Sequence, residues 1–209
     1  MRNKRGYIII ALMVLTACSP KEGSKVSYQS IPIVTKALQD TTSVYYADYK
    51  SYPEDLTTLP IGVFDSGTGG LTVLESLLKM DCFNNTTGEE GSDGIPDLTS
   101  EQFTYLADQA NMPYGNYASA GKLDYFRELV VKDALFLTKV PNRSKIVVIA
   151  CNTATAYGLP DVRDLLSKGI PAVSVIGVIE AGTRASLDMI KPDENAAIGV
   201  LATVGTISS

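Results

Sequence analysis

Two strings of similar pattern constrain the fold of this chain more than any other feature of its sequence. They are IGVFDSGTGGLTVLE at residues 61–75 and VVIACNTATA at residues 147–156. Each begins with a short apolar run, which is typical of a buried strand, and continues through a small polar turn into a helical pattern. Strand, turn and helix repeated in this way predict parallel strands joined by right-handed crossovers.

The same alternation continues through most of the chain. We expect strands at 61–64, 102–106, 145–150, 172–176 and 197–201, and helices near 34–40, 70–79, 118–139, 153–167 and 179–190. This order predicts an α/β fold with a doubly wound parallel sheet. Residues 82–98 are rich in Asn, Gly and Asp and are predicted to form a loop. Its SDGIPD segment loosely resembles an acidic calcium-binding loop, but an ordinary surface insertion is the favoured interpretation.

The two strings place chemically reactive side chains where their strands end. Asp65 and Ser66 follow the first strand, and Cys151, Asn152 and Thr153 follow the other. Because the carboxyl ends of parallel strands face one crevice, these side chains are expected to converge there. The helix start after Cys151 is expected to lower the pKa of its thiol and make it the reactive cysteine. One alternative for each residue stays open: Cys151 as a small buried cysteine, and Asp65 as an ordinary helix cap.

The composition excludes several classes of function. The chain has no histidine, which excludes a Ser-His-Asp triad, a Cys-His dyad and histidine-ligated zinc within it. The net charge is −5 and the 18 basic residues form no run, so nucleic-acid binding is not expected. The glycines of the first turn do not follow the dinucleotide fingerprint, because Thr72 occupies its sixth position. We expect no bound metal.

The first 18 residues are predicted to be an export signal. Basic residues at 2–5 precede an apolar run at 7–15, which is too short to span a membrane and suits a signal peptide. The following LTAC resembles the bacterial lipoprotein box, which implies that Cys18 is acylated after cleavage. This predicts an exported protein, lipid-anchored to a bacterial membrane and facing the periplasm or cell exterior. An uncleaved anchor or a chance match is the alternative. Residues 19–60 are predicted to be a tether and a tyrosine-rich strap.

Five strings occur in one order that resembles bacterial glutamate racemase, of the cofactor-independent aspartate/glutamate racemase superfamily. They are IGVFDSGTGGLTVL, DQANMPYGNY, VVIACNTATA, SVIGVIEAG and IGVLATVGT. The resemblance covers about residues 61–209 and is interrupted by 82–98. It implies two pseudo-symmetric α/β domains, with the first at 61–180 and the beginning of the second at 181–209.

The resemblance also implies a mechanism. In this family two cysteines flank the Cα atom of the substrate and exchange its proton without a cofactor. Cys151 matches the first catalytic cysteine, and the implied substrate is glutamate or a similar acidic amino acid. Asp65 and Ser66 match residues that orient this cysteine and hold the amino end of the substrate. The other matches are a loop that closes on the substrate (Pro113, Tyr114, Gly115), ligands of the substrate carboxylate (Asn152, Thr153) and a second-domain segment (Thr203, Thr206).

Two features depart from the family pattern. The second catalytic cysteine, in a Cys-Thr-His motif, would fall beyond residue 209, and Cys82 does not replace it because it precedes Cys151 within the insertion. The family works in the cytosol, whereas this chain is predicted to carry an export signal. We therefore expect a fragment or truncated product of a racemase, with a homodimer among its assemblies. The alternatives are a non-catalytic lipoprotein that binds acidic amino acids or peptidoglycan fragments, and a Cys82–Cys151 disulfide in place of two free thiols.

Overall fold

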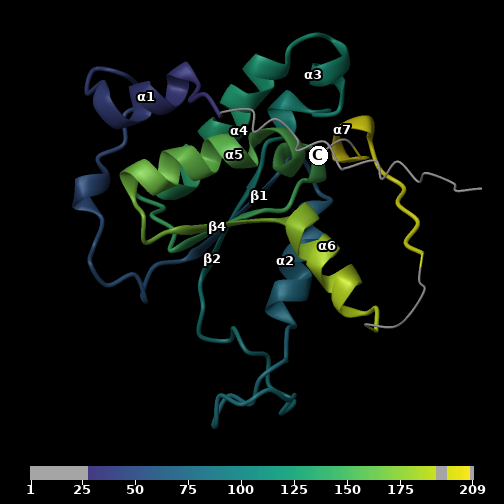
Figure 1. Cartoon of the computed structure of the whole chain (residues 1–209). Coiled ribbons are helices and arrows are strands. Elements are labelled where there is room, and N and C mark those ends of the chain that lie inside the picture. Colours follow the sequence, from purple (N-terminus) through teal and green to yellow (C-terminus); the bar gives the residue numbers. More distant parts are fainter. Residues whose placement is uncertain (1–27, 192–196, 208–209) are drawn as a thin grey trace, which may run out of the picture.

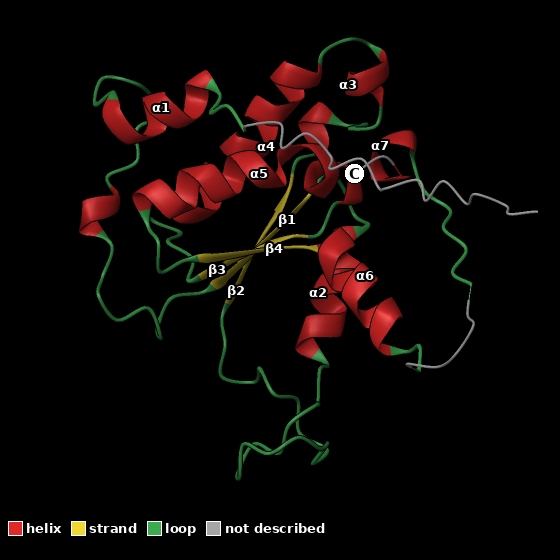
Figure 2. Ribbon diagram, in the orientation of Figure 1, coloured by secondary structure: helices red, strands yellow, loops and turns green. Residues whose placement is uncertain are grey.

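A parallel sheet with helices on both faces forms the centre of the molecule (Figure 2). The computed structural model describes residues 28–191 and 197–207. Within them the strand order is β2-β1-β3-β4, and all three pairings are parallel. The strands are β1 (Ile61–Asp65), β2 (Phe103–Ala107), β3 (Ile146–Ile149) and β4 (Ser174–Gly177). The predicted α/β fold with a doubly wound parallel sheet is therefore confirmed.

The helices cover the sheet because successive strand side chains point to opposite faces. On one face Phe64, Val147 and Ile149 pack into a large core with α4 and α5. On the other face Ile61, Val63 and Val148 pack against α2. Figure 1 shows α1 next to α4 and α5, which it contacts. The helices are α1 (Pro32–Gln39), α2 (Gly70–Leu78), α3 (Asn116–Ser119), α4 (Leu123–Thr138), α5 (Asn152–Gly169), α6 (Val178–Asp188) and α7 (Val204–Ile207), with 3-10 turns at Tyr49–Ser51 and Gln109–Asn111.

The segment before β1 is packed against the domain from residue 28 onward. Helix α1 buries Ile33, Val34 and Ala37 in the core that α4 and α5 form. The Tyr49 hydroxyl lies 2.9 Å from Thr138 Oγ1, and the Tyr52 hydroxyl donates to a backbone carbonyl that precedes β3. These contacts tie the tyrosine-rich strap to α4 and the sheet. The predicted signal peptide and Cys18 lie outside the described residues.

Two loop regions complete the comparison with the predicted elements. Residues 82–98 form a loop with one isolated bridge, between Phe83 and Glu90. The carboxylate of Asp97 accepts backbone N–H groups of this loop, and no described residues form a group of three or more side chains that could hold a metal ion. The strand predicted at 197–201 is wrong, because residues 197–203 are irregular. Their apolar side chains, including the fully exposed Leu201, have no neighbouring strand to pair with in the described part of the chain.

A helix that crosses a lipid bilayer needs about 20 predominantly apolar residues, and the helices of the described residues differ from this. None of those within residues 28–191 and 197–207 combines the length and the apolar character that a membrane crossing requires.

Candidate active site

The topology brings the two diagnostic strings together at one edge of the sheet. The chain leaves β1 toward β2 on one side and reaches β3 on the other, so the strand order reverses between β1 and β3. In open α/β sheets this reversal leaves a crevice at the carboxyl ends of the two strands, where ligands bind. Asp65 ends β1 and Ser66 follows it, and Cys151 comes two residues after the end of β3. The thiol of Cys151 lies 3.9 Å from the Ser66 hydroxyl.

Cys151 occupies the N-cap position of α5. Its sulfur accepts a hydrogen bond from the backbone N–H of Ala154 at 3.5 Å, and the side chain is only 7% exposed. The hydroxyl of Thr155 donates to the carbonyl of Cys151 at 2.9 Å and holds the first turn of the helix. The strand-to-helix position predicted from the sequence is therefore the position observed.

The predicted lowering of the Cys151 pKa is wrong. Burial raises the pKa of this thiol, because the ionised form loses the solvation of water, and the charge of Asp65 acts in the same direction. The hydrogen bonds from Ala154 and Ser66 act the other way and do not compensate. The thiol is therefore protonated at neutral pH.

Asp65 has the structural role that the simpler interpretation assigned to it. Its buried carboxylate accepts the backbone N–H groups of Gly67 at 3.2 Å and Gly70 at 2.8 Å, and so fixes the turn into α2. A Cβ atom on Gly70 would lie 2.5 Å from the Cβ of Asp65 and 3.0 Å from that of Ala150. Glycine is required there because β1, β3 and α2 meet at this point. The same carboxylate faces the thiol closely enough to shift its pKa.

Sequence analysis missed Tyr105, which lies in β2 beside these groups. Its hydroxyl donates to the carbonyl of Gly67 at 3.1 Å. Burial raises the pKa of Tyr105, and the charges of Asp65 and Cys151 raise it further. A lone tyrosine in a strand carries no motif, so only its pairing opposite Val63 in the sheet reveals it.

The loop that carries the PYG string lies next to the first turn. The sulfur of Met112 lies 2.9 Å from the place where a Cβ on Gly67 would stand, so the loop rests on that glycine. Tyr114 is buried, whereas Pro113 and Gly115 are exposed. The loop is thus anchored by its tyrosine and presents the residues on either side of it to solvent.

The remaining predicted ligands lie around the start of α5 and on α7. Asn152 is exposed and Thr153 is buried, both in the first turn of α5. The hydroxyls of Thr203 and Thr206 lie 3.1 Å apart. Helix α7 packs against α5, so this pair lies near the helix that Cys151 caps.

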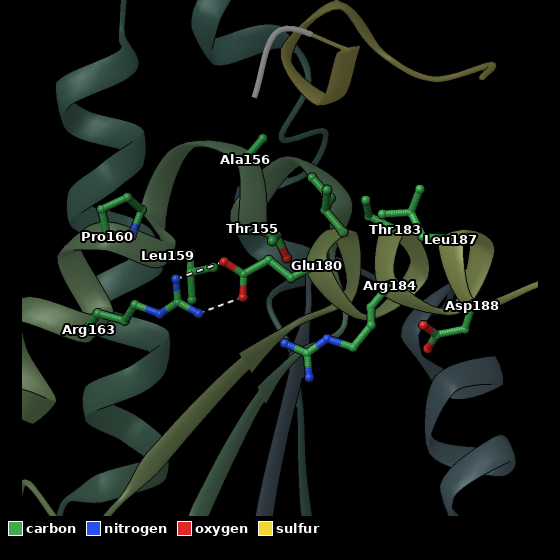
Figure 3. A pocket seen from close by; sticks show the side chains of 11 residues that line it. Thr155, Ala156, Leu159, Pro160, Arg163, Glu180, Thr183, Arg184, Leu187 and Asp188 are labelled. Carbon is green, nitrogen blue, oxygen red and sulfur yellow. Dashed lines mark hydrogen bonds and ion pairs between the residues drawn. The ribbon is translucent and has the colours of Figure 1, made fainter. Parts of the chain in front are cut away.

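A groove of about 800 Å³ opens between α5 and α6 (Figure 3). Thr155 and Leu159 line one wall, and across the groove Arg163 of α5 forms a bidentate ion pair with Glu180 of α6. Cys151 and Asp65 do not line it. The groove is therefore distinct from the crevice between β1 and β3, although Thr155, which lines it, donates to the carbonyl of Cys151.

The described fold and site define an α/β protein with a thiol, a hydroxyl and a carboxylate at the switch point of its parallel sheet. No protein-family model matches the chain. The glutamate racemase of Oceanobacillus iheyensis is 39% identical to it over 149 residues, which are 71% of this chain and 43% of that protein. The glutamate racemase of Listeria monocytogenes serotype 4a is 40% identical over 151 residues, which are 71% of this chain and 44% of that protein.

A solved structure of the same family also matches the chain. The crystal structure of glutamate racemase from Francisella tularensis in complex with D-glutamate matches with a TM-score of 0.50 and 31% identity, over 72% of this chain and 45% of that one. Over the matched residues the chain is therefore a homologue of the glutamate racemases. It spans less than half of the length of the relatives that it matches.

Proposed function

We propose that this chain supplies the first thiol of a cofactor-independent racemase site for glutamate or a similar acidic amino acid. The observation that supports the proposal most directly is the position of Cys151, at the start of α5 beside Ser66 and the carboxylate of Asp65. The homologues are glutamate racemases, and one of them is described in complex with D-glutamate.

The chemistry begins with the amino group of the substrate. An ammonium ion placed between Asp65 and Cys151 would favour the thiolate and offset the effect of burial on its pKa. The thiolate then takes the proton from Cα, so the S–H bond forms as the C–H bond breaks and its electron pair stays on the substrate. A Cα–H is a weak acid, so the developing charge needs aligned donors. The Ser66 hydroxyl, the Asn152 amide and the N–H groups at the start of α5 are the donors that this edge offers.

Inversion needs a second acid that returns a proton to the opposite face of Cα. Cys82 does not fit this role, because it follows the C-terminal end of α2, whereas Asp65 and the candidate site lie at the N-terminal end of that helix. We therefore propose that this chain alone exchanges the proton on one face and that a group outside its described residues completes racemisation.

The test is deuterium exchange at Cα of glutamate in D₂O, followed by NMR and by chiral chromatography. The chain should incorporate deuterium with retention of configuration, and Cys151→Ser should lose this exchange. Cys82→Ser is the matched control and should exchange like the parent chain. Exchange that survives in Cys151→Ser would overturn the assignment of the thiol, and inversion in the parent chain would overturn the proposal that the chain exchanges the proton on one face only.

A second candidate function is non-catalytic binding of an acidic amino acid or a peptidoglycan fragment. The raised pKa of Cys151 favours it, because a protonated and buried thiol is a poor base. Calorimetry separates the two functions: glutamate binding without exchange indicates the binder, and exchange indicates the racemase half-site. If the chain neither binds glutamate nor exchanges its proton, both proposals are wrong.

We also propose that the chain is exported and anchored through a lipid on Cys18. The support is the basic and apolar pattern of the first 18 residues, together with LTAC. Metabolic labelling with a palmitate analogue should mark the parent chain, and Cys18→Ala should abolish the label. Labelling that persists in Cys18→Ala would contradict this proposal.

A further inference from the structure

One buried phenol lies between two carboxylates beside the candidate site. The hydroxyl of Tyr114 is 2.7 Å from Oδ2 of Asp108 and 2.8 Å from Oδ2 of Asp133. A phenol has one proton and can donate to only one of the two carboxylates. A second proton is therefore needed for both contacts to be hydrogen bonds. Asp133 is the residue to carry it, because its side chain is only 7% exposed.

The surroundings of Asp133 agree with this assignment. Burial, together with the charge of Asp108, raises the pKa of Asp133 to about 7, against the opposing effects of the Tyr114 hydrogen bond and the Lys132 charge. Asp108 is partly exposed and also accepts hydrogen bonds from the side-chain amide of Asn111. Asp108 is thus the better acceptor for the phenol proton, and a protonated Asp133 donates to the phenol oxygen.

The charged side chains of α5 and α1, which pack against α4, are not among the groups that act on Asp133. On α5, Asp161 is paired with Arg127 and Tyr28. On α1, Lys36 is exposed to solvent. The groups that act on Asp133 are therefore the two loop residues, Asp108 and Tyr114, together with Lys132 of its own helix.

These contacts join the loop at residues 108–117 to α4. The Tyr114 ring packs on Phe126 of α4 with ring centres 4.8 Å apart, and Asp133 adds the polar contact on the same helix. At its start, the loop is tied to β1 by a hydrogen bond from the N–H of Asp108 to the carbonyl of Asp65. The Tyr114 contact therefore links the loop, whose Met112 rests on Gly67, to α4.

We propose that Asp133 is a positioning residue, which in its protonated form holds the 108–117 loop over the turn that carries Asp65 and Ser66. Docking of the loop does not depend on the proposed function. Only the role of the docked loop in covering a bound substrate rests on the proposed function. The sign follows from linkage. Docking takes up a proton at Asp133, so it is strongest below the ordinary carboxyl pKa of about 4 and weakens as the pH rises through about 7.

The experiment is hydrogen exchange of loop peptides in the full chain at pH 5.5 and 8.5, with exchange times corrected for the intrinsic effect of pH. The Asp133 carboxyl has a pKa of about 7 when the loop is docked and an ordinary pKa of about 3.9 when the loop is free. These two pKa values predict that the equilibrium constant for docking falls on the order of 30-fold between pH 5.5 and 8.5. Protection of 108–117 should fall accordingly in the parent chain, while β1 and β3 stay protected.

Two variants separate positioning from general stability. Asp133→Asn can donate to the phenol oxygen at every pH, so its loop protection should not change between pH 5.5 and 8.5. Asp124→Asn, which changes an exposed carboxylate on the same helix, is the matched control and should follow the parent chain. The proposal is overturned if the parent shows no pH dependence or if Asp133→Asn keeps it. Since the readout needs no substrate, a failure here is distinct from a failure of the deuterium exchange of glutamate.

Discussion

Removing Arg127 should cost more stability than removing its partner Asp161, although the two form one ion pair. Asp161 is fully buried in α5 and accepts two hydrogen bonds from the guanidinium of Arg127, at 2.8 and 2.7 Å, and one from the hydroxyl of Tyr28. The Arg127 side chain keeps 23% of its surface exposed and also lies 3.5 Å from the exposed Asp124. Removal of Arg127 therefore leaves a buried charge, whereas removal of Asp161 leaves a charge that can still reach water and Asp124.

The magnitudes follow from this difference. Arg127→Ala leaves a buried carboxylate without its counter-charge, which costs about 3–5 kcal/mol in proteins. Asp161→Ala leaves a guanidinium that can turn to water and to Asp124, so the loss is nearer that of hydrogen bonds to a charged group, about 1.5–3 kcal/mol. The double variant should cost less than the two single losses together, because each single loss contains the same pair.

Urea unfolding followed by circular dichroism measures all three variants, provided that the slope with urea is unchanged. Lys79→Ala on α2 is the control, because its ion pair with Glu75 is largely exposed and should contribute nothing resolvable. Equal losses for the two single variants, or strict additivity in the double variant, would refute the argument that burial of Asp161 sets the cost.

Three further outcomes are expected. At pH 7 iodoacetamide should modify the exposed Cys82 before Cys151, which reverses the order expected from the sequence. Labelling of Cys151 should rise only as the pH passes above the ordinary pKa of a thiol, because burial raises the pKa of this cysteine. Peptide mass spectrometry that finds Cys151 modified first would contradict its burial. Gly70→Ala should lower the unfolding free energy by about 1–3 kcal/mol through overpacking, whereas Gly182→Ala in the exposed part of α6 should raise it by up to about 1 kcal/mol. Backbone amides at 197–203 should exchange within seconds, and strong protection there in a monomer would show that the segment pairs with a strand.

The elements set by local pattern were predictable from the sequence alone. Apolar runs of four or five residues followed by small polar turns placed β1, β3 and β4 within two residues of their observed bounds. This succeeds because a buried strand needs several consecutive apolar residues, and such a run is visible in the sequence. The turn after β1 and the cap of α5 were found for the same reason, since Asp65 and Cys151 act on N–H groups only a few residues away. Part of the candidate site was thus readable without a structure.

Properties that depend on distant residues needed the tertiary structure. The strand expected at 197–201 fails because a strand requires a partner, and an apolar run does not show whether one lies beside it. The Cys151 pKa moved opposite to expectation because burial, which the whole fold decides, outweighs the local hydrogen bonds at the helix start. Asp133 reads in the sequence as one more helical carboxylate, and only the packing of α4 against the loop brings it to Tyr114. Periodicity determines how a segment folds locally, whereas the solvation and charge that govern reactivity come from atoms far away along the chain.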